Sequence, residues 1–571
     1  MPEVIFLREN IKIEVTNKTT VLEAEIKAGL VPDAPCGGAG KCGKCLVKVD
    51  DKVVKACQTY VERDIVVDTL SSNEGQTAIL TDGYFRDVEF KPDLKQKKIK
   101  LEKPLPGEKK SDWERLLSQL NINVCECTVN FALAEELYNK RMENADWYAI
   151  YTDHEVFSLN KEEQIVTFAA FDIGTTTIAG YLLDSQNGDV LAIRSMMNPQ
   201  TQYGADVISR ANYALENSVE DLSRFVRKAL DDMLGEMCDD AKISRKNIYQ
   251  VSIVGNTCMH HLFLGISPAS LVHAPYTPVI SQEVEVLASK YDININPDGK
   301  LLILPNLAGY VGADTCGCIL TLRPDKTDKL TLMIDIGTNG EIVLGNKESL
   351  YCCSTAAGPA FEGAKIECGM RGSTGAIDHV HFVDGKWEYT TIDNALASGI
   401  CGSGLIDLVA ELCRNGIVDE SGHMESGQNV SSIFMIASPE NSSREGGVYI
   451  TQKDISEIQL AKAAISTGIK IMMDKLEISE DDIDTVYIAG AFGNYMNPQS
   501  AAEIGIIPKG LLKRIKMVGN AAGEGAKIAL LNHDERVEIR ELARQVKFVE
   551  LASEPDFQDC FIDELCFPEQ E

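Results

Sequence analysis

The chain has 571 residues, 44% of them hydrophobic, and its 55 basic and 86 acidic side chains give a formal net charge of -31. This length allows three or four packed domains, and the negative charge repels nucleic acid and anionic membranes, so we expect neither as a partner. The N-terminus lacks the basic flank and apolar core of a signal peptide, and 17 cysteines suit a reducing compartment. We therefore expect a cytoplasmic protein in a reducing or anaerobic cell.

Residues 1–88 are predicted to form a small β-grasp domain. Apolar residues alternate in VIFLRENIKIEV, the segment VLEAEIKAGL has helical spacing, and strands are expected at CLVKV and DIVVDTL. A glycine-rich loop, PCGGAGKCGKC, lies between the helix and the first of these later strands. The domain therefore offers a thiol-rich loop on a small β scaffold.

The cysteines of this domain follow the spacing C-x5-C-x2-C-x11-C and are Cys36, Cys42, Cys45 and Cys57. The first gap is one residue longer than in the plant-type C-x4-C-x2-C pattern of [2Fe–2S] proteins. Glycines around them let a loop wrap closely and point backbone N–H groups at sulfur. The pattern predicts that these four thiols bind a [2Fe–2S] cluster; a zinc site and plain thiols are the alternatives.

The next segments are a predicted linker and a small middle domain. Residues 89–110 are rich in lysine and proline with little apolar periodicity, which is typical of a solvated linker. A capped helix at SDWERLLSQL begins the middle domain, predicted over 111–164. Within it Cys125 and Cys127 lie in an alternating segment, so we expect both thiols on one strand face, where they pack.

The remaining residues, 165–571, contain an internal repeat. TFAAFDIGTTTIAGYLL and LTLMIDIGTNGEIVLG each consist of a strand, an Asp-Ile-Gly-Thr turn and a second strand. Two copies predict a duplicated α/β domain whose second half starts near residue 330, with one hairpin of each half facing a shared cleft. The fold class is thus multidomain α+β and α/β.

The two turns are candidates for a nucleotide site. Asp172 and Asp335 would act on Mg²⁺ through water. Backbone N–H and hydroxyl groups of the turns can hold phosphate oxygens. One such turn is weak evidence, because similar turns arise in ordinary hairpins, whereas two in matched contexts are specific. The turn residues are Gly174, Thr175, Thr176, Gly337, Thr338 and Asn339.

Further glycines are expected at the same cleft. Gly402, Ser403 and Gly404 precede the apolar segment LIDLVAEL, so their backbone donors would lie at the positive end of a helix. Gly490 and Gly493 follow a buried strand and would let adenine or ribose lie against the backbone; tight helix–strand packing is the alternative. Segments around Asn256, Asp314 and Glu362 also have the composition of cleft loops, and the adjacent histidines at 260 and 261 are expected to be hydrogen-bonded structural residues.

Residues 166–535 resemble the superfamily of acetate and sugar kinases, Hsc70 and actin. The resemblance places the two phosphate turns at Asp172 and Asp335 and the adenosine loop at Gly490. A sugar kinase would also need a base carboxylate beside its sugar, and none is evident at the expected place. The resemblance therefore implies an actin-like ATPase that uses ATP to drive a conformational change.

The whole chain, including the ending ELASEPDFQDCFIDELCFP, resembles the reductive activators of corrinoid proteins. The resemblance implies an ATP-hydrolysing iron–sulfur reductase that passes one electron from its cluster to an inactive Co(II) corrinoid and regenerates Co(I) for a methyltransferase system. A plant-type cluster has a potential of about -400 mV and Co(I) needs a lower one, so ATP would supply the difference.

The same resemblance implies a corrinoid methyl-carrier protein as partner, a ferredoxin or flavodoxin as low-potential donor, and a homodimer. The implied cofactors are a [2Fe–2S] cluster, ATP and Mg²⁺. Two alternatives stay open: an electron activator of a 2-hydroxyacyl-CoA dehydratase, and an ATP-gated chaperone that senses redox state. The cysteine count disfavours the former, since those activators share a [4Fe–4S] cluster and lack the N-terminal domain.

Overall fold

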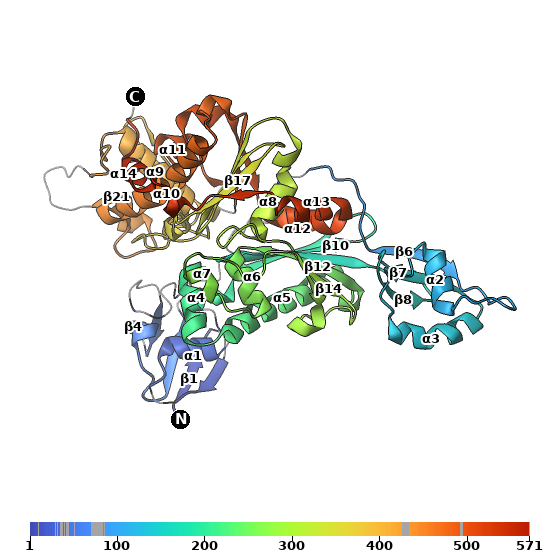
Figure 1. Ribbon diagram of the computed structural model, residues 1–571. Coiled ribbons are helices and arrows are strands. Elements are labelled where there is room, and N and C mark those ends of the chain that lie inside the picture. Colours follow the sequence, from blue (N-terminus) through green and yellow to red (C-terminus); the bar gives the residue numbers. More distant parts are fainter. Residues whose placement is uncertain are drawn as a thin grey trace.

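The computed structural model describes all residues except 9–10, 17, 29, 31, 33, 35–37, 39, 41–44, 51, 70–83, 85, 425–432, 491–494 and 570–571. A small N-terminal domain and a second small domain around β6 lie at opposite sides of two large α/β halves (Figure 1). Both ends of the cleft-forming region are thus flanked by small domains that come earlier in the chain.

The N-terminal domain is a five-stranded sheet, in the order β2-β1-β5-β3-β4, covered by helix α1. Its helix begins with a capping box between Thr20 and Glu23, which satisfies two backbone donors. The helix and strands agree with the predicted β-grasp arrangement. The bounds are β1 Glu3–Phe6, β2 Ile11–Glu14, α1 Val21–Lys27, β3 Leu46–Val49, β4 Lys52–Lys55 and β5 Ile65–Asp68.

The second small domain shows that the predicted linker is wrong in part. Lys95–Lys100 forms β6, which pairs with β7 in the sheet β6-β7-β8. Four of its six residues are lysines, which suit the exposed positions of an edge strand. Because they interrupt the apolar alternation, the sequence does not predict a strand here. Cys125 lies in a turn, so the expected strand face for the two thiols is also wrong. The other bounds are α2 Asp112–Leu120, α3 Phe131–Met142, β7 Asp146–Tyr151 and β8 Val156–Asn160.

The first α/β half has a six-stranded sheet in the order β11-β10-β9-β12-β14-β13. Strands β9 and β10 form an antiparallel hairpin, and β12 runs parallel to β9. The strands are β9 Thr167–Ile173, β10 Thr177–Asp184, β11 Val190–Met197, β12 Ile248–Gly255, β13 Val284–Leu287 and β14 Lys300–Ile303. The helices are α4 Val207–Glu216, α5 Val219–Ala241, α6 Thr257–Leu264, α7 Ala269–Val272 and α8 Ala313–Leu322.

The second half repeats this plan with the order β24-β23-β15-β16-β17-β25. Its first three strands are β15 Thr331–Ile336, β16 Gly340–Gly345 and β17 Leu350–Thr355, and its last are β23 Thr485–Ala489, β24 Ile515–Gly519 and β25 Lys547–Phe548. Small sheets are inserted as β18 Ala376–Val383, β19 Lys386–Thr391 and β20 Gly399–Ile400, and as β21 Ile433–Ala437 and β22 Val448–Thr451. The helices are α9 Gly402–Arg414, α10 Gln452–Lys475, α11 Pro498–Glu503, α12 Ala521–Leu531, α13 His533–Leu542 and α14 Phe557–Asp563.

Helices α8 and α12 join the two halves. They pack with almost no space between their backbones, because a Cβ on Gly525 would lie 2.1 Å from the carbonyl oxygen of Gly317. Residues of both helices belong to one hydrophobic core that includes Phe168 of the first half and Met333 of the second. This close helix pair therefore connects the two halves directly.

Candidate functional site: a cleft between two phosphate hairpins

The first hairpin places Asp172 next to last in β9 and its turn between β9 and β10. Gly174 is required at the turn, since a Cβ there would lie 2.7 Å from the carbonyl oxygen of Thr177. The Asn198 side chain donates to the carbonyl oxygen of Gly174 at 2.8 Å. The space at Gly174 and the Asn198 hydrogen bond therefore restrict the conformation of this turn.

A buried arginine and an asparagine support the same turn. The Arg210 guanidinium is fully buried and donates to the carbonyl oxygens of Thr175 and, at 2.8 Å, Gly204. The Asn256 side chain donates to the Thr175 hydroxyl at 2.8 Å and caps α6 by accepting from the N–H of Met259. A buried cation and a neutral amide thus hold the backbone and the hydroxyl of Thr175.

The second hairpin has the same turn in acidic surroundings. Asp335 lies opposite Glu341 in the β15–β16 register, and the Cys318 thiol donates to its carboxylate at 3.8 Å. Gly490 has a φ of +94°, and a Cβ on it would lie 2.6 Å from the Asp335 carboxylate. Only glycine lets the loop after β23 approach this carboxylate so closely.

A cavity of about 360 Å³ lies between the two hairpins. The predicted residues that line it come from four separate stretches of sequence, which the duplicated fold brings together: Asp172, Gly174, Thr175, Thr176, Asp335, Gly337, Thr338, Asn339, Gly402, Ser403 and Gly490. Gly404 is not among the lining residues; a Cβ there would lie 2.2 Å from the carbonyl oxygen of Ile377, so it serves helix packing. Gly493 lies outside the described residues.

Carboxylates converge at the closed end of the cavity. Burial, and then the nearby carboxylates of Asp314 and Asp335, raise the pKa of Asp172 to about 8. Burial raises the pKa of Asp335 to about 6 against a lowering by the Cys318 hydrogen bond, and burial also raises the pKa of Asp314 and Glu341. Such a cluster of mutually repelling acids is stabilised by a cation.

The residues present fit a magnesium nucleotide. Mg²⁺ is ordinarily held by one or two carboxylates together with water and substrate phosphates, and Asp172 and Asp335 are placed for this. Bound there, Mg²⁺ would neutralise phosphate charge. Among the described residues, no three acidic, histidine or cysteine side chains group closely enough to hold a metal ion directly.

Several lining residues were missed as functional residues by the sequence reasoning. Asp314 and Glu362 belong to segments with a cleft-loop composition, but their roles depend on contacts with distant turns. Arg371, His379 and Tyr495 also line the cavity. The His379 ring is held by the buried Asp407 carboxylate at 3.0 Å, a contact for which the sequence carries no local signal.

The adjacent histidines differ from the expectation that both are hydrogen-bonded. The His261 ring contacts the carbonyl oxygen of Thr257 at 2.7 Å and accepts from the N–H of Val279 at 2.9 Å. Neither ring nitrogen of His260 has a partner among the described residues. Burial lowers the pKa of His260 to about 3, so this ring is neutral.

Of the four predicted cluster ligands, the structure describes two, Cys45 and Cys57. Cys45 is buried directly before β3, and Cys57 is partly buried in a short turn of helix, Ala56–Gln58, after β4. Gly38 in the intervening loop has a φ of +83°, which glycine adopts readily. Cys36 and Cys42 lie outside the described residues.

Comparison with known proteins agrees with this architecture. Residues 5–68 match the model of a 2Fe-2S iron-sulfur cluster binding domain. Residues 168–327 match the RACo middle region, which here is the first α/β half, and residues 329–571 match the C-terminal domain of RACo, the ASKHA domain. The fold and cleft therefore define an ASKHA-type ATPase preceded by a [2Fe–2S] domain.

Relatives extend the match to nearly the full chain. The corrinoid activation enzyme RamQ of Eubacterium limosum is 34% identical, with 97% of each chain covered. A reductase of the Co(II) methylated amine-specific corrinoid protein of Methanosarcina barkeri is 23% identical over 70% of this chain and 76% of its own. The solved structure of a reductive activator for corrinoid, iron-sulfur protein is 33% identical, covers 100% of this chain and 99% of its own, and has a TM-score of 0.77.

This chain belongs to the RACo family of reductive activators of corrinoid proteins. The predicted family, fold class and cofactors, a [2Fe–2S] cluster, ATP and Mg²⁺, are confirmed. No helix in the described part of the chain has the length and apolar character needed to span a membrane.

Proposed function

We propose that this protein uses ATP to reduce the cobalt of a corrinoid methyl-carrier protein from Co(II) to Co(I), with its own [2Fe–2S] cluster as the immediate electron donor. The observation that carries the proposal is the cleft, in which Asp172 and Asp335 from two duplicated halves face one cavity in a chain that also has a cluster domain. Nucleotide bound between two halves favours their closed arrangement by its differential affinity.

A connection between the cluster domain and the cleft supports the coupling. The segment after the N-terminal domain is bonded to the large halves: the N–H of Tyr84 donates to the carbonyl oxygen of Val518 in β24 at 2.8 Å. Arg86 pairs with Glu535 of α13 and donates to the carbonyl oxygen of Leu320 in α8 at 3.2 Å. Since α8 begins beside the cavity residue Asp314, movement of the cleft would move this segment.

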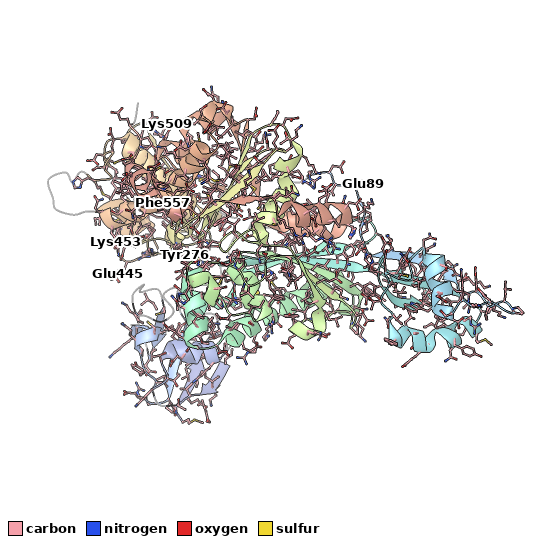
Figure 2. The ribbon with its side chains drawn as sticks, in the orientation of Figure 1. Glu89, Tyr276, Glu445, Lys453, Lys509 and Phe557 are labelled. Atoms are coloured by element: carbon pink, nitrogen blue, oxygen red, sulfur yellow. The ribbon has the colours of Figure 1, made fainter. Side chains whose placement is uncertain are left out.

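The segment makes further hydrogen bonds at the end of α12 and at the residue that follows it. The Asn532 side chain donates to the carbonyl oxygen of Glu89 at 3.0 Å, and Figure 2 shows Glu89 near the place where Figure 1 labels α13. The N–H of Lys91 donates to the carbonyl oxygen of Leu531 at 2.8 Å. We propose that this attachment transmits the nucleotide state to the cluster domain.

The finer assignments are part of the same proposal. A low-potential ferredoxin or flavodoxin would reload the cluster, the protein would act as a homodimer, and it would work in the cytoplasm. The catalytic roles of Asp172 and Asp335, and cluster ligation by Cys36, Cys42, Cys45 and Cys57, are likewise proposed.

The direct test is cobalt reduction by purified protein. With a chemical reductant, a corrinoid protein and MgATP, we expect the Co(II) absorption to be replaced by that of Co(I). Omission of ATP, or Asp335→Ala, abolishes this conversion, whereas the exposed control Glu445→Gln leaves it unchanged (Figure 2). Equal reduction with and without ATP contradicts the proposal.

The cluster assignment has its own test. Cys42→Ala should remove the visible iron–sulfur absorption and cobalt reduction while ATP binding remains. Cys125→Ala is the matched control, because its thiol is exposed in the second small domain. A Cys42→Ala protein with full absorption and activity would exclude this thiol as a ligand.

The connection can be tested with Arg86→Met. We expect cobalt reduction per ATP hydrolysed to fall about fivefold or more, in the range of ordinary allosteric coupling, while ATP hydrolysis continues. Arg63→Met, in an exposed pair with Asp50, is the control. An unchanged ratio in Arg86→Met would show that the segment does not transmit the nucleotide state.

A further inference from the structure

One carboxylate joins the two phosphate hairpins. The Thr176 hydroxyl of the first hairpin donates to Glu362 Oε2 at 2.5 Å, and the Thr338 hydroxyl of the second donates to Glu362 Oε1 at 2.5 Å. The residue is 186 positions from one partner and 24 from the other. Glu362 thus lies where the two halves of the ATPase meet.

The backbone holds Glu362 in this place. It ends the short 3-10 helix Pro359–Glu362, whose residue Phe361 is buried in the core of the second half. Gly358 and Gly363 flank this turn with φ of +76° and +75°, and a Cβ on Gly363 would lie 2.5 Å from the carbonyl oxygen of Met370. The carboxylate is therefore presented from a packed turn with few alternative positions.

Its surroundings differ from those of the other acids of the cavity. In the group Asp172, Asp314, Asp335 and Glu341, the carboxylates of Asp314 and Asp335 raise the pKa of their neighbours. Glu362 instead accepts hydrogen bonds from two hydroxyls and is partly exposed to the cavity. Asp378 also lines the cavity outside this group, but it accepts from Thr390, and among the described residues it makes no hydrogen bond to either hairpin turn.

The geometry sets its distance from a terminal phosphate. The hydroxyls of such turns donate to phosphate oxygens, at about 2.7 Å. Each hydroxyl has one proton, so a threonine that donates to a phosphate oxygen no longer donates to Glu362. The phosphate oxygen and the Glu362 carboxylate would then lie on two sides of the hydroxyl oxygen, within about two hydrogen-bond lengths of each other. Two anions at this separation repel, but one water between them can donate to the carboxylate and direct its oxygen at phosphorus.

We propose that Glu362 is the general base for hydrolysis of ATP in this cleft. The water oxygen forms a bond to the terminal phosphorus while the bond from that phosphorus to the bridging oxygen of ADP breaks. The water proton passes to Glu362 and then to solvent, so the products are ADP and inorganic phosphate. This inference rests on the proposed function, because it assigns a residue to its ATP-hydrolysing step.

The test compares turnover with nucleotide binding in Glu362→Gln, whose amide oxygen can accept from one threonine hydroxyl while its NH2 group donates to the hydroxyl oxygen of the other. We expect kcat for ATP to fall at least about 100-fold, as for loss of a general base, while affinity for a non-hydrolysable ATP analogue stays within about threefold. Glu367→Gln, an exposed glutamate of the same segment, keeps the wild-type rate. A kcat within about threefold of wild type, or loss of analogue binding parallel to the loss of turnover, overturns the assignment.

A second variant provides an independent readout. Glu362→Ala leaves space for a small acid, so sodium formate should restore its turnover about tenfold or more, whereas chloride at equal ionic strength should not. Equal effects of the two salts overturn the assignment. Wild-type protein that hydrolyses ATP but leaves Co(II) unreduced contradicts only the proposed function, whereas rapid hydrolysis by Glu362→Gln contradicts only the role of Glu362.

Discussion

The two phosphate hairpins share the sequence Asp-Ile-Gly-Thr but are supported by different neighbours. In the first, the buried Arg210 holds the backbone and the amide of Asn256 holds the Thr175 hydroxyl. In the second, the aspartate lies opposite Glu341 across the strand pair and accepts from the thiol of Cys318. A duplicated motif therefore does not imply equal roles, because buried donors hold the first turn in place, whereas a thiol hydrogen bond opposes the rise in the pKa of the second aspartate.

The largest expected effect tests whether the two aspartates are equivalent. Since burial and two acidic neighbours raise the pKa of Asp172 to about 8, whereas that of Asp335 is about 6, Asp335 carries more charge at neutral pH. We expect Asp335→Asn to reduce kcat for ATP about 1000-fold and Asp172→Asn about 100-fold, within the range for electrostatic groups. Steady-state hydrolysis over a Mg²⁺ titration measures both, and a larger loss in Asp172→Asn would reverse the comparison.

Loss of the cationic support should destabilise the first half. Arg210→Met leaves the carbonyl oxygens of Thr175 and Gly204 without this donor in a buried place, which costs about 3 kcal/mol. Denaturant unfolding measures the loss, and affinity for ATP should fall as the turn loosens. Arg224→Met, with a side chain 67% exposed, is the control. Equal stability of the two variants would contradict the role given to Arg210.

The acidic surroundings predict a pH dependence without nucleotide or metal. The pKa of Asp172 is raised in the folded protein, so its contribution to stability is fully present below its unfolded pKa and is lost as pH rises through about 8. The free energy of unfolding should fall by about 4 kcal/mol from pH 5 to pH 8.5, and Mg²⁺ should reverse part of the fall. Asp172→Asn should weaken the dependence of the free energy of unfolding on pH. The same dependence in that variant would show that other groups cause it.

The smallest expected effect concerns a helix cap. Asn256→Ala removes the cap of α6 and the donor to the Thr175 hydroxyl, with a loss of about 1 kcal/mol in stability and a raised KM for ATP. Asn532→Ala removes the cap of α13, which lies outside the cavity lining. Asn532→Ala should lower the free energy of unfolding by a similar amount without a change in KM for ATP. A raised KM in both variants would show that loss of stability, and not the contact with Thr175, raises it.

Local patterns predicted much of this molecule. The capped helix that follows Ser111, the helix over LIDLVAEL and both hairpins appear as expected. The strand Lys95–Lys100 was missed because its lysines face solvent, which removes the apolar alternation that marks a strand. Gly404 was assigned to the nucleotide because a glycine needed for packing and one needed for a ligand look alike in a sequence.

The sequence by itself determined the cluster motif, the duplicated phosphate turns and the family resemblance, because each depends on residues close together in the chain. Only the tertiary structure decided which acids share the cavity and that Glu362 joins Thr176 to Thr338. It also decided that Arg86 connects the segment after the N-terminal domain to α13. These contacts span 449 positions in one case and 186 in another, and packing of whole elements, which leaves no local pattern, sets such distances.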